Sequence, residues 1–503
     1  MASGDTSAQA APDRPAPAAL FASRRAQLLW FLAIALLTRI SVLGDTNYFN
    51  DEYFYFQGGL RLFEGDLPYV DVWDRKGPGL FLTYGLAGLF SSSVMAYQML
   101  ALIFAAATAI CVMLIAERFT SRTGAVLGGT LYLVLLVFFG GGGGQSPVFY
   151  NLWIALAALG LVRALPAVQR ADAPGALYAA MAAAGFALTY KQTAICEAAF
   201  LGLFALWQLR RGGVPPRRLA AIAIGMLAAG IAPMALFAAF YALAGHFAEF
   251  WNAMVTANLA KAYNPAGDHW RRIAALAMLI APAMLPALAG LLIARQPGQP
   301  PRGFLAGWLV AGLAGVAIVP NFYEHYLLPL CLPVSVAAAR ALGFGRIGRI
   351  YGIAVILFGL LFGTSLDFST RRQSREAMAA MAADIRASAR APRLLVFEGP
   401  VDLYRQIGTY PPSALYYPLH LYFPAEHNVS HIASADAVRA ILAWQPTAVV
   451  TYHDPKSYDR NPATAPPVAA YIAANCTLKA TRRLPEVYSA HLTDLWLCSE
   501  ARR

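Results

Sequence analysis

Apolar runs recur along the first 367 residues of the chain, and this repetition constrains the fold more than any other feature. Eleven of them are about long enough to cross a bilayer, which takes roughly 20 helical residues. They are approximately residues 27–44, 94–116, 123–139, 146–165, 175–190, 192–209, 218–244, 271–294, 303–320, 325–343 and 350–367. Only 13% of the 503 residues are charged, whereas a soluble protein has about 25%. The sequence therefore predicts a polytopic α-helical membrane protein.

The cations between these runs predict the orientation of the chain. With the N-terminus inside, the cytoplasmic gaps hold Arg118, Arg122, Arg163, Arg170, Arg210, Arg211, Arg217, Arg218, Arg295, Arg302, Arg340, Arg346 and Arg349. The opposite gaps hold Arg61, Arg75, Lys76, Lys191, Lys261, Arg271 and Arg272. This asymmetry follows the positive-inside rule and predicts a multi-pass protein of the cytoplasmic (inner) membrane. It also accounts for the net charge of +12, so we expect membrane lipids and no nucleic acid as partners.

The predicted membrane domain follows a short cytoplasmic tail and contains a long first outer loop. Residues 1–26 are rich in Ala and Pro and predict a disordered cytoplasmic tail. Residues 27–367 form the predicted transmembrane domain, whose first outer loop covers residues 45–92. The apolar run 78–90 is too short to span, so we expect a juxtamembrane helix that lies at the interface or dips into it.

A second, soluble region follows at residues 368–503. A polar helix is expected at 371–390, strands at 393–398 and 447–452, and a helix at 434–443. These elements predict a small extracytoplasmic α/β domain. It contains Cys476 and Cys498. An oxidising compartment would permit a disulfide between them, and two unpaired thiols are the alternative.

The first outer loop carries an acidic pair near the membrane. Asp51 and Glu52 would lie in the first turn of a helix over 51–64, with Asn50 as its N-cap and Gly65 as its end. The aromatic residues of that helix, Tyr55 among them, suit the lipid headgroup zone. A helix N-terminus also favours an ionised Asp51. The alternative is an ordinary amphipathic helix whose acidic residues cap its start.

Cations and other polar groups are expected on the same side of the membrane. Arg75 and Lys76 could bind a lipid phosphate or anchor the loop to headgroups. Lys191 lies at a tight outer turn, Glu324 and His325 open the tenth run, and Arg39 is near the outer end of the first. His325 is either a ligand contact or a structural histidine, and Arg39 could snorkel outward. The run Gly140–Gly144 reads as a flexible outer turn, and no spacing suggests a metal site.

At these residues the chain resembles the GT-C membrane glycosyltransferases, in particular the protein O-mannosyltransferase and aminoarabinose-transferase branch, which includes bacterial lipopolysaccharide-sugar transferases. The matching residues are Arg39, Asn50-Asp51-Glu52 with Tyr53 and Tyr55, Leu67-Pro68-Tyr69 with Asp71, Asp74–Gly79, Lys191-Gln192-Thr193 and Glu324–Pro329. Several relatives carry an acidic residue in the second outer loop, where this chain has Gln145-Ser146-Pro147. The resemblance covers roughly residues 27–345.

The resemblance implies an inverting transferase that uses a polyprenyl-phosphate sugar, without a metal or other cofactor. Asp51 would be the general base, with Glu52 as its support or substitute, and Lys76 would contact the donor phosphate, joined by Arg75 and His325. The acceptor, a glycan, lipid or protein, is left open. Two other classes compete with this interpretation. One is a secondary transporter or flippase of a lipid-linked or small polar substrate, and the other is a non-catalytic scaffold with a partner-binding domain.

Overall fold

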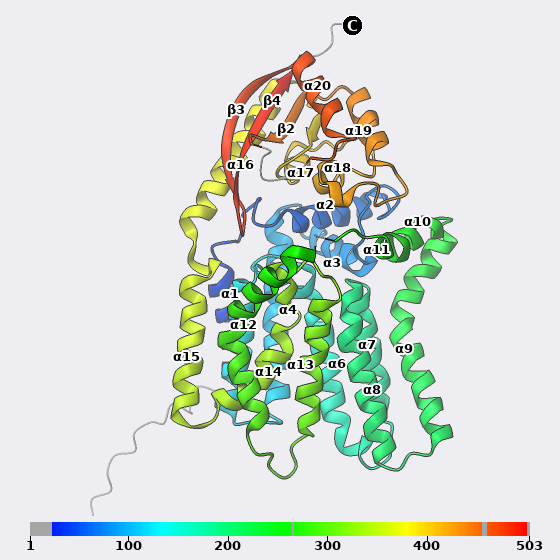
Figure 1. Cartoon of the computed structure of the whole chain (residues 1–503), viewed down its shortest axis with the longest axis vertical. Coiled ribbons are helices and arrows are strands. Elements are labelled where there is room, and N and C mark those ends of the chain that lie inside the picture. Colours follow the sequence, from blue (N-terminus) through cyan, green and yellow to red (C-terminus); the bar gives the residue numbers. More distant parts are fainter. Residues whose placement is uncertain (1–22, 264–265, 455–459, 500–503) are drawn as a thin grey trace, which may run out of the picture.

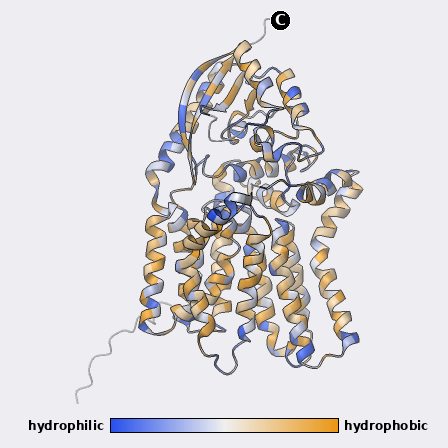
Figure 2. Cartoon of the chain, viewed as in Figure 1, coloured by the Kyte–Doolittle hydropathy of each residue, from blue (hydrophilic) through white to orange (hydrophobic). Residues whose placement is uncertain are grey.

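The protein consists of a bundle of long apolar helices and a smaller α/β unit, with two buried helices between them (Figure 1). This arrangement is seen in a computed structural model that describes residues 23–263, 266–454 and 460–499. Hydrophobic residues dominate the bundle, and hydrophilic ones gather at its ends and in the α/β unit (Figure 2). The predicted tail, residues 1–26, falls almost entirely outside the described residues.

Among the residues that the structure describes, six helices are long and apolar enough to cross a membrane by length and composition. They are α4 (Val94–Ala116), α6 (Ser146–Val168), the span Gln192–Arg211 that contains α8 (Ile195–Arg211), α9 (Pro216–Leu243), α12 (His269–Leu292) and α15 (Gly345–Phe362). Four shorter apolar helices accompany them: α5 (Arg122–Phe138), α7 (Gly175–Leu188), α13 (Arg302–Ala317) and α14 (Cys331–Leu342). The first expected span corresponds to α1 (Arg24–Arg39). Each expected run is thus a helix, while the number that crosses a bilayer stays a prediction.

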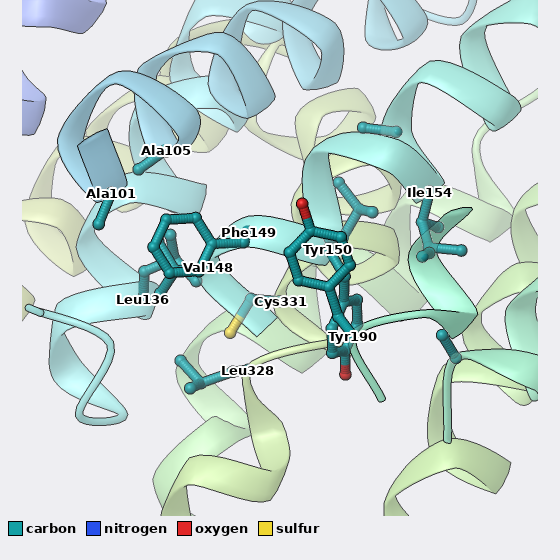
Figure 3. Close-up of a cluster of buried hydrophobic side chains, with 14 of the residues drawn as sticks. Ala101, Ala105, Leu136, Val148, Phe149, Tyr150, Ile154, Tyr190, Leu328 and Cys331 are labelled. Atoms are coloured by element: carbon teal, nitrogen blue, oxygen red, sulfur yellow. The ribbon is translucent and has the colours of Figure 1, made fainter. Parts of the chain in front are cut away.

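The centre of the bundle is closely packed around α6 and α14. Figure 3 shows Phe149, Leu328 and Cys331 side by side with Leu136 and Val148. All five of these side chains lie in the buried core, and none is more than 6% exposed. Interiors packed in this way are rigid, so the bundle gives the loops at its outer end a firm base.

Two helices of the first outer loop lie between the bundle and the α/β unit. They are α2 (Asn50–Glu64) and α3 (Pro78–Gly88). Four consecutive aromatic residues of α2, positions 53–56, are at most 1% exposed, because the bundle lies on one side of the helix and the α/β unit on the other (Figure 1). The expectation of an interfacial helix over 51–64 is therefore wrong. The α3 end of the loop exposes Leu86 and Leu89, so the expected place of residues 78–90 at the interface stays a prediction. Gly65 ends α2 with a φ of 107°, as expected.

Asn50 is not the N-cap of α2. The cap position is Phe49, which makes no side-chain cap bond. The Asn50 side chain instead donates to Glu486 Oε1 at 2.9 Å and accepts from the N–H of Val401 at 3.3 Å. Both partners belong to the α/β unit, so Asn50 joins the two parts of the protein.

The α/β unit contains a four-stranded sheet in the order β1-β2-β4-β3. Its strands are β1 (Leu394–Val396), β2 (Ala448–Tyr452), β3 (Cys476–Pro485) and β4 (Ala490–Cys498). β1 and β2 are parallel, and the other pairs are antiparallel. Its helices are α16 (Phe368–Ser388), α17 (Leu403–Ile407), α18 (Pro418–Tyr422), α19 (Ser434–Ala443) and α20 (Ala465–Asn475). Cys476 and Cys498 face each other on β3 and β4 and form a disulfide.

The hairpin between β3 and β4 reaches down to the membrane bundle (Figure 1). At its tip the N–H of Val487 donates to the carbonyl of Tyr48 at 2.9 Å. Beside it, Arg371 of α16 forms a buried ion pair with Asp45 at 3.1 Å. Ser374 donates to the same carboxylate at 2.8 Å. These buried polar contacts hold the α/β unit in a defined position over the outer loop.

Candidate active site

A cavity of about 650 Å³ lies where the first outer loop, the outer ends of several helices and the α/β unit meet. Seven residues predicted from the sequence line it: Asp51, Tyr55, Arg75, Lys76, Lys191, Glu324 and His325. Two further predicted residues, Glu52 and Arg39, do not line it. Short elements complete the rim, namely the π-turn Asn252–Thr256, α11 (Ala257–Leu259) and the 3₁₀ turn Glu324–Leu327. The short helix α10 (Phe247–Trp251) precedes the π-turn.

Asp51 is the acidic group of α2 that faces this cavity. Its Oδ1 accepts a hydrogen bond from the Tyr417 hydroxyl at 2.5 Å, and its Oδ2 accepts one from the Tyr55 hydroxyl at 3.1 Å. Tyr55 lies one turn further along the same helix, where residues four apart share a face. The carboxylate is therefore half-buried and held by a hydroxyl from each part of the protein.

Lys76 also lines the cavity, in a loop fixed by its own backbone. Its N–H donates to Asp74 Oδ1 at 2.8 Å, and its carbonyl accepts from the Tyr69 hydroxyl at 2.8 Å. The next residue, Gly77, packs so closely on the backbone of Thr189 that a side chain there would collide with it. This contact places the Lys76 loop against the turn that carries Lys191.

Three lysines meet at this side of the cavity. They are Lys76, Lys191 and Lys261, and the whole chain has only five. Burial, and then the charges of Lys76 and Lys261, lower the pKa of Lys191 to about 7. Burial and the nearby Arg75 lower the pKa of Lys261 to about 8. The nearest carboxylate oxygen to Lys76 Nζ is that of Asp74, 3.9 Å away. Positive charge thus accumulates here, as in a site for an anion.

Arg75 is already paired. It contacts both oxygens of Glu426, at 2.5 and 2.6 Å, in the α/β unit. His420 lies between Glu426 and Asp74, with ring nitrogens 3.5 and 3.7 Å from their oxygens. Burial alone would lower the pKa of His420, but these carboxylates outweigh it and raise that pKa. Arg75, predicted as a phosphate contact, lines the cavity but serves to join the two parts of the protein.

His325 belongs to an aromatic group at the rim. Its ring stacks on Tyr323, with centroids 5.7 Å apart, and meets Phe49 and Tyr326 edge on. Burial, and then the charge of Lys191, lower the pKa of His325 well below its ordinary value. His325 is therefore neutral near pH 7, and it can offer one hydrogen-bond donor and one acceptor but not a charge.

Glu52 points away from the cavity, because consecutive residues on a helix do not share a face. Its carboxylate is fully buried, and its Oε2 accepts a hydrogen bond from the Tyr97 hydroxyl at 3.4 Å. A side chain on Gly143 would collide with it. Burial raises the pKa of Glu52 to about 8. Its expected place beside Asp51 in the site is therefore wrong.

Arg39 is also buried beneath the glycine run. It is 0% exposed, and its guanidinium donates to the carbonyl of Gly141 at 3.1 Å. The alternative that Arg39 snorkels outward is therefore wrong. So is the expected flexible turn, because residues 140–144 are all buried. Arg39 and Glu52 together stabilise this turn, which leads directly to the cavity residue Gln145.

Several cavity residues were not identified from the sequence. They are Lys261, Tyr417, His420, Glu426 and Tyr488. Four of these come from the α/β unit, more than 300 residues after Asp51, and no local pattern marks them. Lys261 could have been identified from the sequence, since it is one of the few cations in the predicted outer loops.

Comparison with profiles of known protein families gives no match, and neither does comparison with the sequences of curated proteins. Solved structures do match. Cupriavidus metallidurans ArnT bound to undecaprenyl phosphate aligns with a TM-score of 0.59 and 14% identity, covering 94% of this chain and 98% of that one. The apo state of the same protein aligns with a TM-score of 0.58 and 15% identity, covering 93% of this chain and 97% of that one. The apo form of the Archaeoglobus fulgidus oligosaccharyltransferase aligns with a TM-score of 0.43 and 11% identity, covering 85% of this chain and 69% of that one.

The likeness to ArnT extends over both parts of the protein, since it covers nearly the whole of each chain. At 14% identity it is a likeness of fold. ArnT is an aminoarabinose transferase with the GT-C architecture. The chain therefore has the fold of the GT-C membrane glycosyltransferases.

Proposed function

We propose that the protein is an inverting glycosyltransferase that moves a sugar from a polyprenyl-phosphate donor to an acceptor hydroxyl. The observation that carries this proposal is one cavity lined both by an oriented carboxylate, Asp51, and by the lysines Lys76, Lys191 and Lys261. The first group suits proton removal. The second suits the negative charge that develops on a departing phosphate.

The reaction is a single displacement. Asp51 takes the proton of the acceptor hydroxyl as its oxygen bonds to the anomeric carbon from the face opposite the phosphate. The bond from that carbon to the phosphate oxygen breaks, and the electron pair leaves with the polyprenyl phosphate. Lys76, with Lys191 and Lys261, stabilises the additional negative charge. Transfer without a metal stays a prediction.

A second cavity supports a lipid-linked donor. It has a volume of about 620 Å³ and lies between α3, α7 and α9. Apolar side chains such as Leu82, Phe186 and Leu236 line it. So does Pro78, only two residues after Lys76. A hydrocarbon chain in this cavity would begin close to the lysines, which is what a lipid phosphate requires. The ArnT structure that matches this chain holds undecaprenyl phosphate.

The two competing functions explain less. A transporter needs a substrate site near the bilayer midplane, whereas Asp51 and Lys76 belong to the first outer loop. A scaffold leaves the cavity and its lysines without a role. We place the N-terminus in the cytoplasm and the cavity at the outer face of the inner membrane, because the positive-inside rule favours that orientation.

The proposal is tested with the purified full-length protein and a panel of undecaprenyl-phosphate sugars carrying a neutral hexose, a pentose or an amino sugar. Mass spectrometry measures the release of undecaprenyl phosphate in the presence of an extract of envelope lipids and glycans. At least one donor is expected to turn over. In parallel, lipid and polysaccharide profiles of a deletion strain, complemented by wild type or Asp51→Asn, identify the acceptor. No turnover and unchanged profiles would contradict the proposal.

Glu52→Gln is expected to leave the transfer rate within about threefold of wild type. Because the pKa of Glu52 is about 8, its carboxyl is mostly neutral at pH 7, and the amide has the same shape and charge. The measurement is the rate of undecaprenyl phosphate release, with the melting temperature as a check on folding. If folded Glu52→Gln loses as much transfer rate as Asp51→Asn, Glu52 takes part in catalysis.

The pH dependence of phosphate binding is expected to report on Lys191. Because its pKa is about 7, Lys191 is a cation at about pH 6 and mostly neutral at about pH 8.5. Wild type should therefore lose affinity for undecaprenyl phosphate over this range relative to Lys191→Arg, by up to about tenfold. The phosphate titrates equally in both proteins, so the difference isolates Lys191. Parallel binding curves would show that Lys191 does not contact the phosphate.

A further inference from the structure

One wall of the cavity comes from the α/β unit, and Tyr417 is the residue of that wall that contacts Asp51. The two residues are 366 positions apart, and the Tyr417 hydroxyl donates to Asp51 Oδ1 at 2.5 Å. Tyr417 is 4% exposed. Hydrogen bonds to ionised acceptors are shorter and stronger than neutral ones, so this contact couples the α/β unit to the proposed base.

Tyr417 is itself held from several sides. Its ring stacks on Phe54 of α2, with centroids 4.6 Å apart, and meets His420 edge on at 5.3 Å. His420 is placed in turn by Asp74 and Glu426. A side chain enclosed in this way has little rotamer freedom, so the phenol oxygen has a defined position.

We propose that Tyr417 is a positioning residue for Asp51, so that the α/β unit completes the active site; this inference rests on the function proposed above. Tyr55 holds the other carboxylate oxygen, and the two hydroxyls fix the plane of the carboxylate. Each oxygen keeps a second lone pair, and one of these receives the proton of the acceptor. Tyr417 keeps its own proton throughout the reaction.

Tyr417→Phe in the full-length protein tests this proposal. The phenyl ring keeps the stacking on Phe54, so the protein is expected to fold. We expect kcat to fall about 10- to 100-fold, because a misplaced base is a large loss, with the KM for the active undecaprenyl-phosphate sugar within about twofold of wild type.

Tyr416→Phe is the matched control. Tyr416 is adjacent, fully buried and also in contact with Phe54, but it does not line the cavity. Its variant should have wild-type kcat and KM. Equal behaviour of the two variants would overturn the role of Tyr417. If Asp51→Asn is inactive at the same time, the proposed function still holds, and if Asp51→Asn is fully active, both proposals fail.

Discussion

Asp51→Asn is expected to lower sugar transfer by about 10²- to 10⁴-fold, the usual contribution of a general base. Asparagine has nearly the shape of aspartate, and its carbonyl oxygen can still accept a hydroxyl hydrogen bond from Tyr417 or Tyr55. It cannot take the acceptor proton. The measurement is the rate of undecaprenyl phosphate release at saturating donor, together with the melting temperature of the purified protein.

Glu64→Gln is the control for this substitution. Glu64 is the last residue of α2, the helix that carries Asp51, and it is exposed. It does not line the cavity, so its variant should retain wild-type transfer. Wild-type activity in folded Asp51→Asn would rule out Asp51 as the base, whatever the behaviour of Glu64→Gln.

The helices were predictable from the sequence because each depends on local patterns. Apolar runs mark the bundle, and the helix 434–443 of the α/β unit has the expected bounds. Asp51, Lys76 and Lys191 could also be identified, since charged residues at the outer ends of apolar runs are few. That they line one cavity depends on tertiary contacts such as the close packing of Gly77 on Thr189.

The burial of α2 could not be predicted, because its aromatic residues suit a lipid interface and a protein interior equally well. The choice depends on the α/β unit, which covers the helix from more than 300 residues away (Figure 1). The same distance explains why Tyr417 was missed. Glu52 and Arg39 were misplaced because both pack against the glycine run 140–144, a tertiary contact that no local pattern marks. Asn50, expected as a helix cap, contacts that unit instead.

The charges of the site have two separate functions in this arrangement. Arg75, Asp74, His420 and Glu426 neutralise one another across the contact between the two parts of the protein. The lysines are less fully compensated: the closest carboxylate oxygen to Lys76 Nζ, that of Asp74, is 3.9 Å away. Burial, and then the charges of Lys76 and Lys261, lower the pKa of Lys191. Buried lysines that repel one another destabilise the free protein. Such a group is expected where an anion binds, because the negative charge of the ligand offsets the repulsion between the lysines.

Lys76→Met is accordingly expected to lower transfer by about 10²- to 10³-fold, as the loss of one charge-stabilising donor does. Methionine keeps the length of the side chain and its contact with the Tyr55 ring, which lies 5.0 Å from Lys76 Nζ, but has no charge. Lys76→Arg should recover part of the activity. Lys479→Met, at an exposed position of β3, should match wild type.

The same Lys76 variants distinguish a role in binding from a role in the transition state. If Lys76 holds the phosphate mainly as it leaves, Lys76→Met should lose more in kcat than in affinity for the intact donor, because the phosphate gains its second negative charge only when the bond breaks. Calorimetry with undecaprenyl phosphate measures the affinity for the phosphate, and donor turnover measures kcat. Equal transfer rates for Lys76→Met and Lys479→Met would remove Lys76 from the site and leave Lys191 and Lys261 to bind the anion.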